Sequence, residues 1–422
     1  MQTERAMTGE RDGHVTVIGA GVVGCCCALH LLRDGWKVTI VDPEAPGTQT
    51  SYGNAGAISP QSINPMAGPG VLKQIPGWLA DPLGPLALRW GYLPKALPWL
   101  LKFVAAGTPA RIKAQSDALA DLHRPVIDAH EELAELARVR DLIHRQGALT
   151  VYETDANFAA DAAGRQRMRD KGHVIEELGP EEIAQLEPGL APIFKHATWA
   201  PNSGHTVNPG RLTEAYGATA RSMGAEIVAA RVVGIDWKAD GGGMLSTDRG
   251  ARPFDRIVVA AGAWSARLSR MLGDPFPLES ERGYHMMLPK PGFTTRRPVS
   301  FNERRFMTTT MEKGLRLAGT VEFAGLEAPP TWGRADKLLR HAAEVFREVD
   351  VAGAERWMGQ RPATPDSLPV ISASPKRKGV YYAFGHGHLG LTAGAITGRH
   401  IASLVAGRTP DIDLKPFRID RF

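Results

Sequence analysis

A glycine-rich turn between two apolar segments near the N-terminus constrains the fold more than any other feature of the chain. The stretch HVTVIGAGVVGCCCALHLLRDGWKVTIVD runs from His14 to Asp42. It contains, in order, an apolar run at 15–18, the pattern G-x-G-x-x-G at 19–24, a helix-like run at 22–33 and a second apolar run at 37–41. This order predicts a βαβ unit, in which two parallel strands flank a helix.

Each glycine of that pattern has a physical reason. Gly19 permits a tight turn, Gly21 lets the backbone approach a pyrophosphate, and Gly24 lets the helix pack closely on the strand. The N-terminus of the helix, with Ala20 and Val22 beside it, offers free N–H groups and a positive dipole end to phosphate oxygens. The turn therefore predicts a site for the phosphates of a dinucleotide.

Asp42 ends the second strand and can accept hydrogen bonds from the ribose hydroxyls of an adenosine. The motif does not by itself distinguish NAD from FAD. Strand-like runs return much later, at 225–237 and in RIVVAAGAWSARL at 256–268. A cofactor domain interrupted in this way favours FAD, whose long body contacts distant segments.

Composition narrows the class of protein. A chain of 422 residues exceeds one ordinary domain, and 43% hydrophobic with 23% charged residues is typical of a folded core. The net charge is +5, but the basic residues are scattered, so we expect no nucleic-acid partner. The three cysteines are consecutive, at 25–27, and we expect small buried helix residues rather than a disulfide or a metal site.

The N-terminal residues carry charges and lack the apolar run of a secretion signal, so we expect a cytoplasmic protein. One stretch, Gly77–Phe103, combines tryptophans, leucines, prolines and lysines. Short amphipathic pieces of this kind lie in membrane interfaces or pack against their own domain. We expect packing, and peripheral contact of 77–103 with the inner face of the cell membrane remains the alternative.

Three further stretches resemble one known family. They are TSYGNAGAISP (Thr50–Pro60), GQRPATPDSLPVIS (Gly359–Ser372) and GHGHLGLTAGAITGRHIASLVAGRTP (Gly385–Pro410). In this order they resemble the S-x-x-N-A-G loop, the G-x-R-P-x-T-P-D segment and the G-H-G-x-x-G-x-T loop of the D-amino-acid oxidase superfamily of FAD enzymes. The nearest resemblance is to bacterial D-amino acid dehydrogenases, and roughly residues 61–350 match only loosely.

The resemblance implies FAD as the cofactor and a set of residues around it. The residues that would line the flavin and its phosphates are Ser51, Asn54, Ala55 and Gly56. Val232 would contact the adenine through its backbone, and Ala261 and Gly262 would close over the cofactor. The pyrimidine edge of the isoalloxazine would be cradled by Gly387, Leu389, Gly390 and Thr392.

The resemblance also implies substrate contacts. Arg361 would bind the substrate carboxylate, because a guanidinium fork matches a carboxylate in bidentate fashion. Tyr284 either donates a hydrogen bond to that carboxylate or is a half-buried strand tyrosine. His386 and His388 lie beside the expected flavin face, and His388 departs from the family pattern. It either contacts the amine or a side-chain oxygen of the substrate, or it is a loop histidine without a chemical role.

The implied reaction is oxidation of an amine at its CH–NH2 or CH–NH group. Hydride leaves Cα, the imino acid is hydrolysed to a 2-oxo acid, and the electrons pass to a quinone or another acceptor. The first alternatives are a dehydrogenase for a cyclic D-imino acid such as D-proline or D-hydroxyproline, and a glycine or sarcosine oxidase. An RNA-modifying FAD protein, or a binding protein in which FAD is structural, belongs to a different class.

We therefore expect an α/β fold, α+β in part. A Rossmann-like FAD-binding domain would be discontinuous, with residues 14–60, 200–272 and 353–422. A substrate-binding domain of residues 61–199 and 273–352 would be built on a mixed or antiparallel sheet plus helices. Residues 1–13 would form a flexible tail. The segment 111–140 predicts a long helix that Pro125 divides or kinks.

Overall fold

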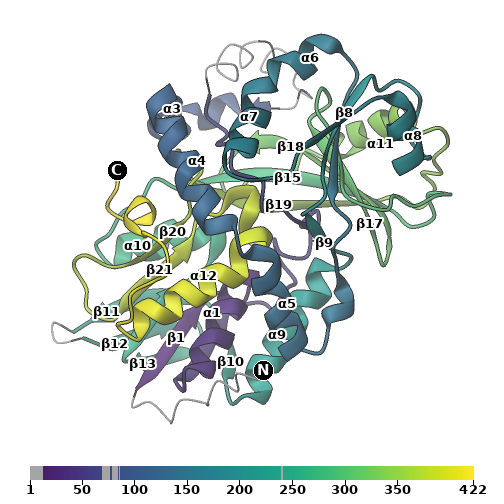
Figure 1. The fold of residues 1–422 in the computed structure, drawn as a ribbon. Coiled ribbons are helices and arrows are strands. Elements are labelled where there is room, and N and C mark those ends of the chain that lie inside the picture. The colour runs from purple at the N-terminus through teal and green to yellow at the C-terminus, as the bar shows by residue number, and fades with distance from the viewer. Residues whose placement is uncertain (1–12, 69–76, 78–83, 85, 239–240) are drawn as a thin grey trace.

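The structure is a computed structural model that describes residues 13–422 except 69–76, 78–83, 85 and 239–240. The expected tail at 1–13 lies outside the described residues apart from Gly13. Two large sheets dominate the described part of the chain, one of six strands and one of nine (Figure 1). This mixed α/β arrangement is the expected fold class.

The six-stranded sheet contains the predicted βαβ unit. Its strands, in spatial order, are β10 (Glu226–Ala229), β2 (Lys37–Asp42), β1 (His14–Ile18), β14 (Arg256–Val259), β21 (Val380–Phe384) and β20 (Val370–Ala373). The first five are parallel, and β20 pairs antiparallel with β21. Helix α1 (Val22–Arg33) connects β1 to β2. Three distant parts of the sequence thus build one sheet.

Helices α1 and α12 (Gly390–Val405) pack against each other and against strands of this sheet (Figure 1). The contact is close, because a Cβ atom added at Gly398 would lie 2.6 Å from the backbone of Cys26. All three cysteines of α1 are fully buried, and burial raises the pKa of the Cys25 thiol to about 12. They are small packing residues, as the sequence predicts.

The long helix predicted for 111–140 is divided at Pro125. Helix α4 (Pro109–His123) ends before this proline and α5 (Val126–Leu136) begins after it. The buried alanines and leucines of both helices share one apolar core with α1 and α12. Helices α4 and α5 therefore pack on the helices of the six-stranded sheet. The expected boundaries instead assign residues 61–199 to the substrate-binding half.

The nine-stranded sheet forms the second half. Its strands are β19 (Glu355–Ala363), β15 (Glu279–Leu288), β18 (Gly314–Phe323), β17 (Phe306–Met311), β16 (Val299–Phe301), β6 (Ala148–Tyr152), β8 (His196–Ala200) and β7 (Glu176–Leu178), with β4 (Leu86–Leu88) beside β18. Most pairs are antiparallel, but β16 and β6, and β18 and β4, are parallel. β19 pairs with β15, so the beginning of the expected segment 353–422 lies in this half.

The remaining elements surround the two sheets. They are β3 (Ala57–Ile58), β5 (Ile143–His144) and β9 (Gly204–Thr206) in one small sheet, β11 (Val232–Trp237), β12 (Gly243–Thr247) and β13 (Gly250–Phe254) in another, and helices α3 (Leu93–Ala106), α6 (Asp155–Ala160), α7 (Ala162–Asp170), α8 (Pro180–Leu186), α9 (Pro209–Ser222), α10 (Ser265–Met271) and α11 (Gly333–Val345). All ten residues of β15 are buried, because α11 packs on the outer face of the nine-stranded sheet and the six-stranded half meets its inner face.

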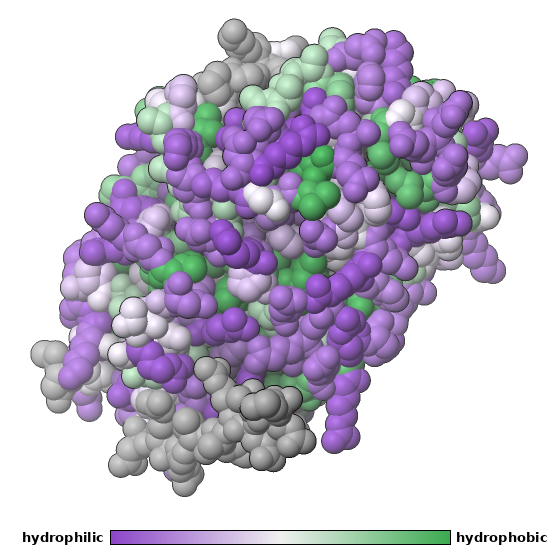
Figure 2. Space-filling view, viewed as in Figure 1, coloured by the Kyte–Doolittle hydropathy of each residue, from purple (hydrophilic) through white to green (hydrophobic). Residues whose placement is uncertain are grey.

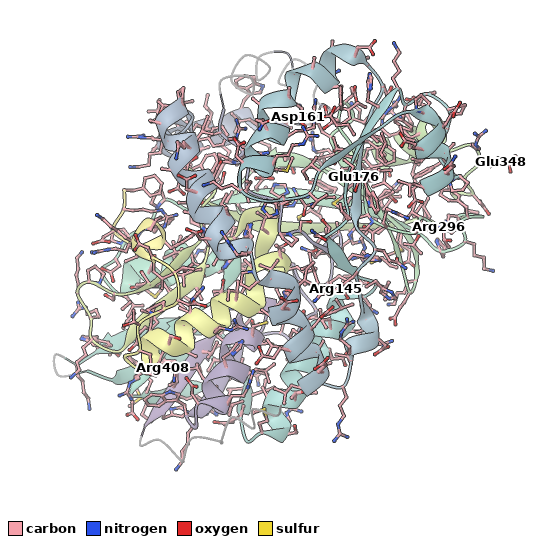
Figure 3. All side chains as sticks on the ribbon, viewed as in Figure 1. Arg145, Asp161, Glu176, Arg296, Glu348 and Arg408 are labelled. Carbon is pink, nitrogen blue, oxygen red and sulfur yellow. The ribbon has the colours of Figure 1, made fainter. Side chains whose placement is uncertain are left out.

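The molecular surface carries charges of both signs. The face seen in Figure 2 is mostly hydrophilic, with apolar residues in small separate patches. The six charged residues labelled in Figure 3, three acids and three arginines, come from separate segments and lie on both halves of the molecule. Among the described residues, none of the helices is long and apolar enough to cross a bilayer.

Two glycines of α12, Gly394 and Gly398, lie at different distances from α1 and together test this contact. We expect Gly398→Ala to lower the free energy of unfolding by about 1–3 kcal/mol, because the new methyl group forces α12 away from the Cys26 backbone. At Gly394 the nearest atom to an added Cβ is 3.5 Å away, an ordinary contact. Gly394→Ala is therefore expected to be neutral or to stabilise by up to about 1 kcal/mol. Urea unfolding measures both, and equal effects would contradict the packing described.

Candidate functional site

A cavity of about 480 Å³ opens at the carboxyl edge of the six-stranded sheet. Its walls include the last residues of β1, β2 and β21 and the residues that follow β14. Ligands of open α/β sheets bind at this edge, and the volume lies in the range of small-molecule sites. The cavity is therefore the candidate cofactor site.

Most of the residues predicted to bind a cofactor line this cavity. They are Gly19, Ala20, Gly21, Val22, Asp42, Ser51, Asn54, Val232, Ala261, Gly262, Gly387 and Gly390, and His386 lines it as well. Five predicted residues are not among its lining residues, namely Gly24, Ala55, Gly56, Leu389 and Thr392. Gly24 is still needed nearby, because an added Cβ would lie 2.0 Å from the carbonyl oxygen of Gly19.

The turn between β1 and α1 is shaped for an anion. Gly19 has a φ of +120°, and an added Cβ would lie 2.4 Å from the carbonyl oxygen of Ala260. Helix α1 starts without a side-chain cap and without an acidic residue in its first turn. The Val22 N–H donates to Ser51 Oγ at 3.0 Å, which fixes the Ser51 loop against the helix. The positive end of the helix thus faces the cavity and suits a pyrophosphate.

Asp42, at the end of β2, lines the cavity beside the same turn. Its Oδ2 accepts from the Ala20 N–H at 2.7 Å and its Oδ1 from the Glu44 N–H at 2.9 Å. Burial raises the pKa of Asp42 above its usual value, although these two N–H groups act in the opposite direction. Each carboxylate oxygen can accept a further bond, so the residue fits the ribose hydroxyls of an adenosine.

The loop at 54–57 is fixed from two sides. Asn54 Oδ1 accepts from the Gly56 N–H at 2.8 Å, and Gly56 adopts a φ of +83° against the carbonyl oxygen of Thr206. Thr392, in the first turn of α12, donates to the Ala57 carbonyl oxygen at 3.2 Å. Thr392 and Gly56 therefore hold the loop beside the cavity rather than lining it.

Two side chains that the sequence did not single out tie this loop to the nine-stranded sheet. Arg316 of β18 is buried, and its Nη1 donates to the carbonyl oxygens of Tyr52 at 2.9 Å and Asn54 at 2.5 Å. Burial lowers the pKa of Arg316 to about 10. His285 of β15 lies 3.2 Å from the Gly53 carbonyl oxygen and stacks on Trp357 at 4.8 Å. The loop therefore lies at the boundary between the six-stranded half and the nine-stranded half.

Arg361 lies on β19 directly opposite Glu281 of β15. Its Nη1 donates to Glu281 Oε1 at 3.2 Å and to the Thr320 carbonyl oxygen at 3.1 Å. Within the described part of the chain, Nε and Nη2 have no acceptor, so one edge of the guanidinium remains for a ligand. The guanidinium lies over Gly283, where an added Cβ would be 2.1 Å from Cζ. Burial lowers the pKa of Arg361, with Glu281 acting in the opposite direction.

Glu281 also contacts His388, so it joins two predicted site residues. His388 Nε2 lies 2.5 Å from Glu281 Oε1, the same oxygen that accepts from Arg361. Burial raises the pKa of Glu281, but the charges of His388 and Arg361 outweigh it and hold that pKa below its usual value. Glu281 is therefore a buried carboxylate anion. In the sequence, the only feature that could have pointed to Glu281 is its place two residues before Gly283 in a strand-like run.

His386 is directed into the protein. Its Nε2 lies 2.9 Å from Thr397 Oγ1 of α12, and the side chain is buried. Burial lowers the pKa of His386 to about 3, so the ring is neutral. It fixes the glycine-rich loop to the helix that follows, whereas His388, in the single turn at 387–389, is partly exposed.

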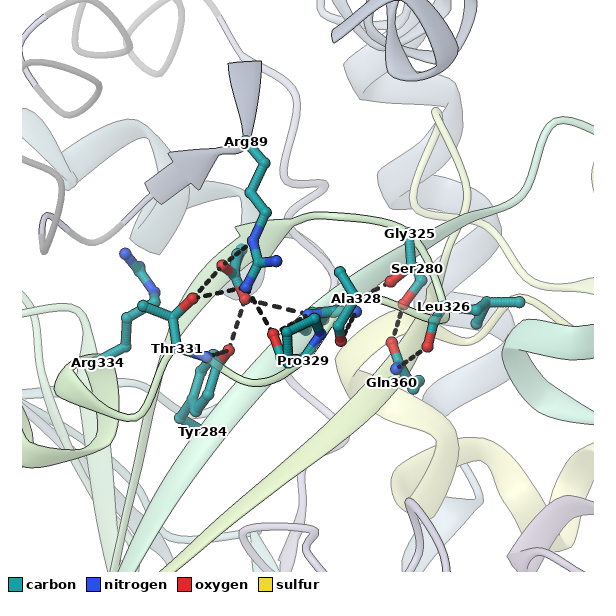
Figure 4. A network of polar contacts seen from close by, with 12 residues as sticks. Arg89, Ser280, Tyr284, Gly325, Leu326, Ala328, Pro329, Thr331, Arg334 and Gln360 are labelled. Atoms are coloured by element: carbon teal, nitrogen blue, oxygen red, sulfur yellow. Dashed lines mark hydrogen bonds and ion pairs between the residues drawn. The ribbon is translucent and has the colours of Figure 1, made fainter. Parts of the chain in front are cut away.

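Tyr284 lies on the other face of β15 from Glu281, because alternate residues of a strand point to opposite faces. Its hydroxyl donates to Glu322 Oε2 at 2.5 Å and accepts from the Thr331 N–H at 2.9 Å (Figure 4). The one hydroxyl proton is thus already used. Of the two alternatives that the sequence left open, the geometry favours a structural tyrosine.

Tyr284 belongs to a buried network that fastens the loop at 325–331 to the outer face of the sheet (Figure 4). Arg282 is fully buried and donates to the carbonyl oxygens of Gly325, Ala328 and Pro329. Arg89 donates to Glu322 at 3.2 Å in the same network. The network makes β15 a rigid support for Glu281 on the inner face.

The residues present fit FAD. A glycine turn without side chains, a helix N-terminus and Asp42 suit the adenosine diphosphate part, and a second glycine-rich loop, with Gly387 and Gly390, lines the same cavity. Arg361 contacts Glu281, which also contacts His388, and His388 directly follows the lining residue Gly387. A carboxylate held by Arg361 would thus lie beside the cofactor cavity.

Comparisons with known proteins show the family of the chain. The DAO family, described as FAD dependent oxidoreductase, matches residues 14–404. A D-amino-acid oxidase of Bradyrhizobium diazoefficiens is 42% identical over 97% of this chain and 99% of its own length. A D-amino acid dehydrogenase of Paramagnetospirillum magneticum is 32% identical over 97% of this chain and 98% of its own length.

Solved structures show the same fold. Glycine oxidase from Geobacillus kaustophilus superposes with a TM-score of 0.74 at 23% identity, covering 97% of this chain and 99% of that one. L-proline dehydrogenase from P. horikoshii superposes with a TM-score of 0.75 at 17% identity, covering 98% of each chain. From its sequence match and its site, the chain belongs to the DAO family of FAD-dependent oxidoreductases.

Proposed function

We propose that this FAD-dependent oxidoreductase oxidises a D-amino acid at Cα and releases an imino acid that water converts to a 2-oxo acid. The observation that carries the proposal is the open Nε–Nη2 edge of Arg361, whose partner Glu281 also contacts His388 beside the lining residue Gly387. The names of the relatives at 42% and 32% identity support a D-amino acid over an L-amino acid. We further propose that the six-stranded half binds FAD and the nine-stranded half binds the substrate.

When bound, FAD supplies the oxidant that accepts a hydride. The protein's part is to orient the substrate. Arg361 holds the carboxylate in bidentate fashion, and its place opposite Glu281 of the fully buried strand β15 limits its movement. Gly283 leaves the space that the guanidinium needs. Arg316 and His285 close the loop at 52–54 against the sheet, which keeps water from the reacting atoms.

A substrate panel tests this function. The purified, FAD-loaded protein is assayed with D-alanine, L-alanine, D-proline and glycine, first with a dye acceptor, then with a quinone, and then with oxygen alone. We expect D-alanine to be oxidised and L-alanine not. Preference for D-proline or glycine over all acyclic D-amino acids with a side chain would contradict the proposal. The acceptor arms separate a quinone-linked dehydrogenase from an oxidase.

We expect Arg361→Ala to raise the KM for a D-amino acid by at least about 30-fold, the equivalent of losing ~2 kcal/mol of charge-assisted hydrogen bonding. The flavin absorbance is expected to persist, because the residue does not line the cofactor cavity. The matched control is Arg356→Ala on the same strand, whose side chain is half exposed and paired with Asp336. Equal KM values for the two variants would refute the role of Arg361.

We also propose that α3 contacts a membrane surface. Its inner face packs on the protein as the sequence predicts, since Trp99 donates to the Ala363 carbonyl oxygen at 3.1 Å and stacks on Phe103. Its outer face exposes Leu97, Leu101 and Val104, which are 45%, 62% and 47% exposed. These residues recur with helical spacing. The exposed lysines of the same helix, Lys95 and Lys102, suit anionic headgroups, as in interfacial amphipathic helices.

The double variant Leu97→Ser, Leu101→Ser tests this contact by sedimentation with phosphatidylglycerol-rich vesicles. We expect its vesicle affinity to fall by about tenfold or more, because two large apolar side chains no longer enter the interface. Val174→Ser is the control, since Val174 is 47% exposed on a different part of the surface. Binding of the wild type that matches that of the double variant would contradict the proposal.

A further inference from the structure

Two basic side chains converge on one buried carboxylate oxygen at the predicted substrate site. Oε1 of Glu281 accepts from Arg361 Nη1 at 3.2 Å and lies 2.5 Å from His388 Nε2. The three residues come from β15, β19 and the loop at 387–389. The Glu281 side chain is only 3% exposed, whereas that of His388 is 37% exposed and can exchange protons with water.

The charge of this group decides whether it can accept an anion. Glu281 and Arg361 alone sum to zero, so a substrate carboxylate would leave one uncompensated negative charge in a buried site. Such a charge is costly unless a cation pairs with it. When His388 is protonated, the three side chains carry a net charge of +1, which matches one carboxylate.

The surroundings leave His388 as the group that can supply this charge. Glu281 from β15 contacts His388 and joins it to Arg361 from β19. Arg316 from β18, another buried cation, is bound to the carbonyl oxygens of Tyr52 and Asn54. The first turn of α12, which follows it, contains no charged residue. His386, two residues earlier, is buried and bonded to Thr397, away from Glu281.

We propose that His388 is a charge-balancing residue: a substrate carboxylate binds Arg361 only when a protonated His388 is paired with Glu281. This inference rests on the proposed function for the role of Arg361 and goes beyond it by coupling substrate binding to a proton. Because Nε2 points at Glu281, His388 acts through the pair and not by touching the reacting atoms. It is a positioning residue.

Propionate, which is D-alanine without its amine, is the probe for the wild-type FAD-loaded protein. Its affinity is measured by the change in flavin absorbance and by calorimetry in two buffers of different ionisation enthalpy. We expect the affinity to fall as the pH rises, with a limiting slope of about tenfold per pH unit, because binding takes up one proton. Calorimetry is expected to record proton uptake on binding, and propionamide, which carries no charge, is expected to show neither effect.

Charge counting gives a sharper test with variants. His388→Gln leaves the three side chains with a net charge of zero. Propionate affinity at low pH is therefore expected to fall by about tenfold or more and to lose its pH dependence. Adding Glu281→Gln restores a sum of +1 without any titrating group. The double variant is therefore expected to bind within about threefold of the wild type at low pH, and equally at high pH. His173→Gln, on the surface far from β15 in sequence, is expected to behave as the wild type.

Three outcomes would overturn the inference. They are a wild-type affinity for propionate that does not change with pH, binding without proton uptake, and a double variant as weak as His388→Gln. Because the first two need no variant, a misfolded variant does not rescue the inference. If D-alanine is oxidised while any of these holds, this inference alone fails. If propionate does not bind and D-alanine is not oxidised, the proposed function fails with it.

Discussion

The molecule depends on holding one short loop, residues 52–57, between two sheets that are built from separate parts of the chain. Arg316 of the nine-stranded sheet binds the loop by donating hydrogen bonds to two carbonyl oxygens of the loop. Thr392 holds it from the start of α12, on the side of the six-stranded sheet. Among the described residues Arg316 has no acidic partner, and these backbone oxygens offset part of the cost of burying its charge. The cofactor cavity and Arg361 therefore keep a fixed relation to each other.

Burial gives the substrate side its chemical character. Glu281 and Arg361 meet across neighbouring strands, where a carboxylate and a guanidinium satisfy each other in a dry setting. The same pairing neutralises the arginine that we propose to bind the substrate carboxylate as a cation. A third, partly exposed side chain on the loop beside the cavity resolves this conflict, since it can carry the missing charge and exchange its proton with water.

Local patterns predicted the parts of the site that local chemistry determines. Gly19, Gly21 and Asp42 follow from the strand–turn–helix pattern, and Arg361 from its resemblance to a family motif. Glu281 and Arg316 escaped prediction because their partners are 80 and 262–264 residues away in the sequence. No periodicity reports which strands become neighbours. Tyr284 is three residues from Glu281, and this odd spacing on one strand could have assigned the two side chains to opposite faces of the sheet.

The central claim is that segments far apart in the sequence enclose one FAD with Arg361 positioned to hold an acid group beside it. A crystal structure of the FAD-loaded protein with a bound 2-oxo acid product tests this claim most directly. The account predicts FAD along the cavity from Asp42 to Gly387, with the product carboxylate within hydrogen-bond distance of Nε and Nη2 of Arg361. A product carboxylate bound elsewhere, with Arg361 contacting only Glu281 and Thr320, would contradict it.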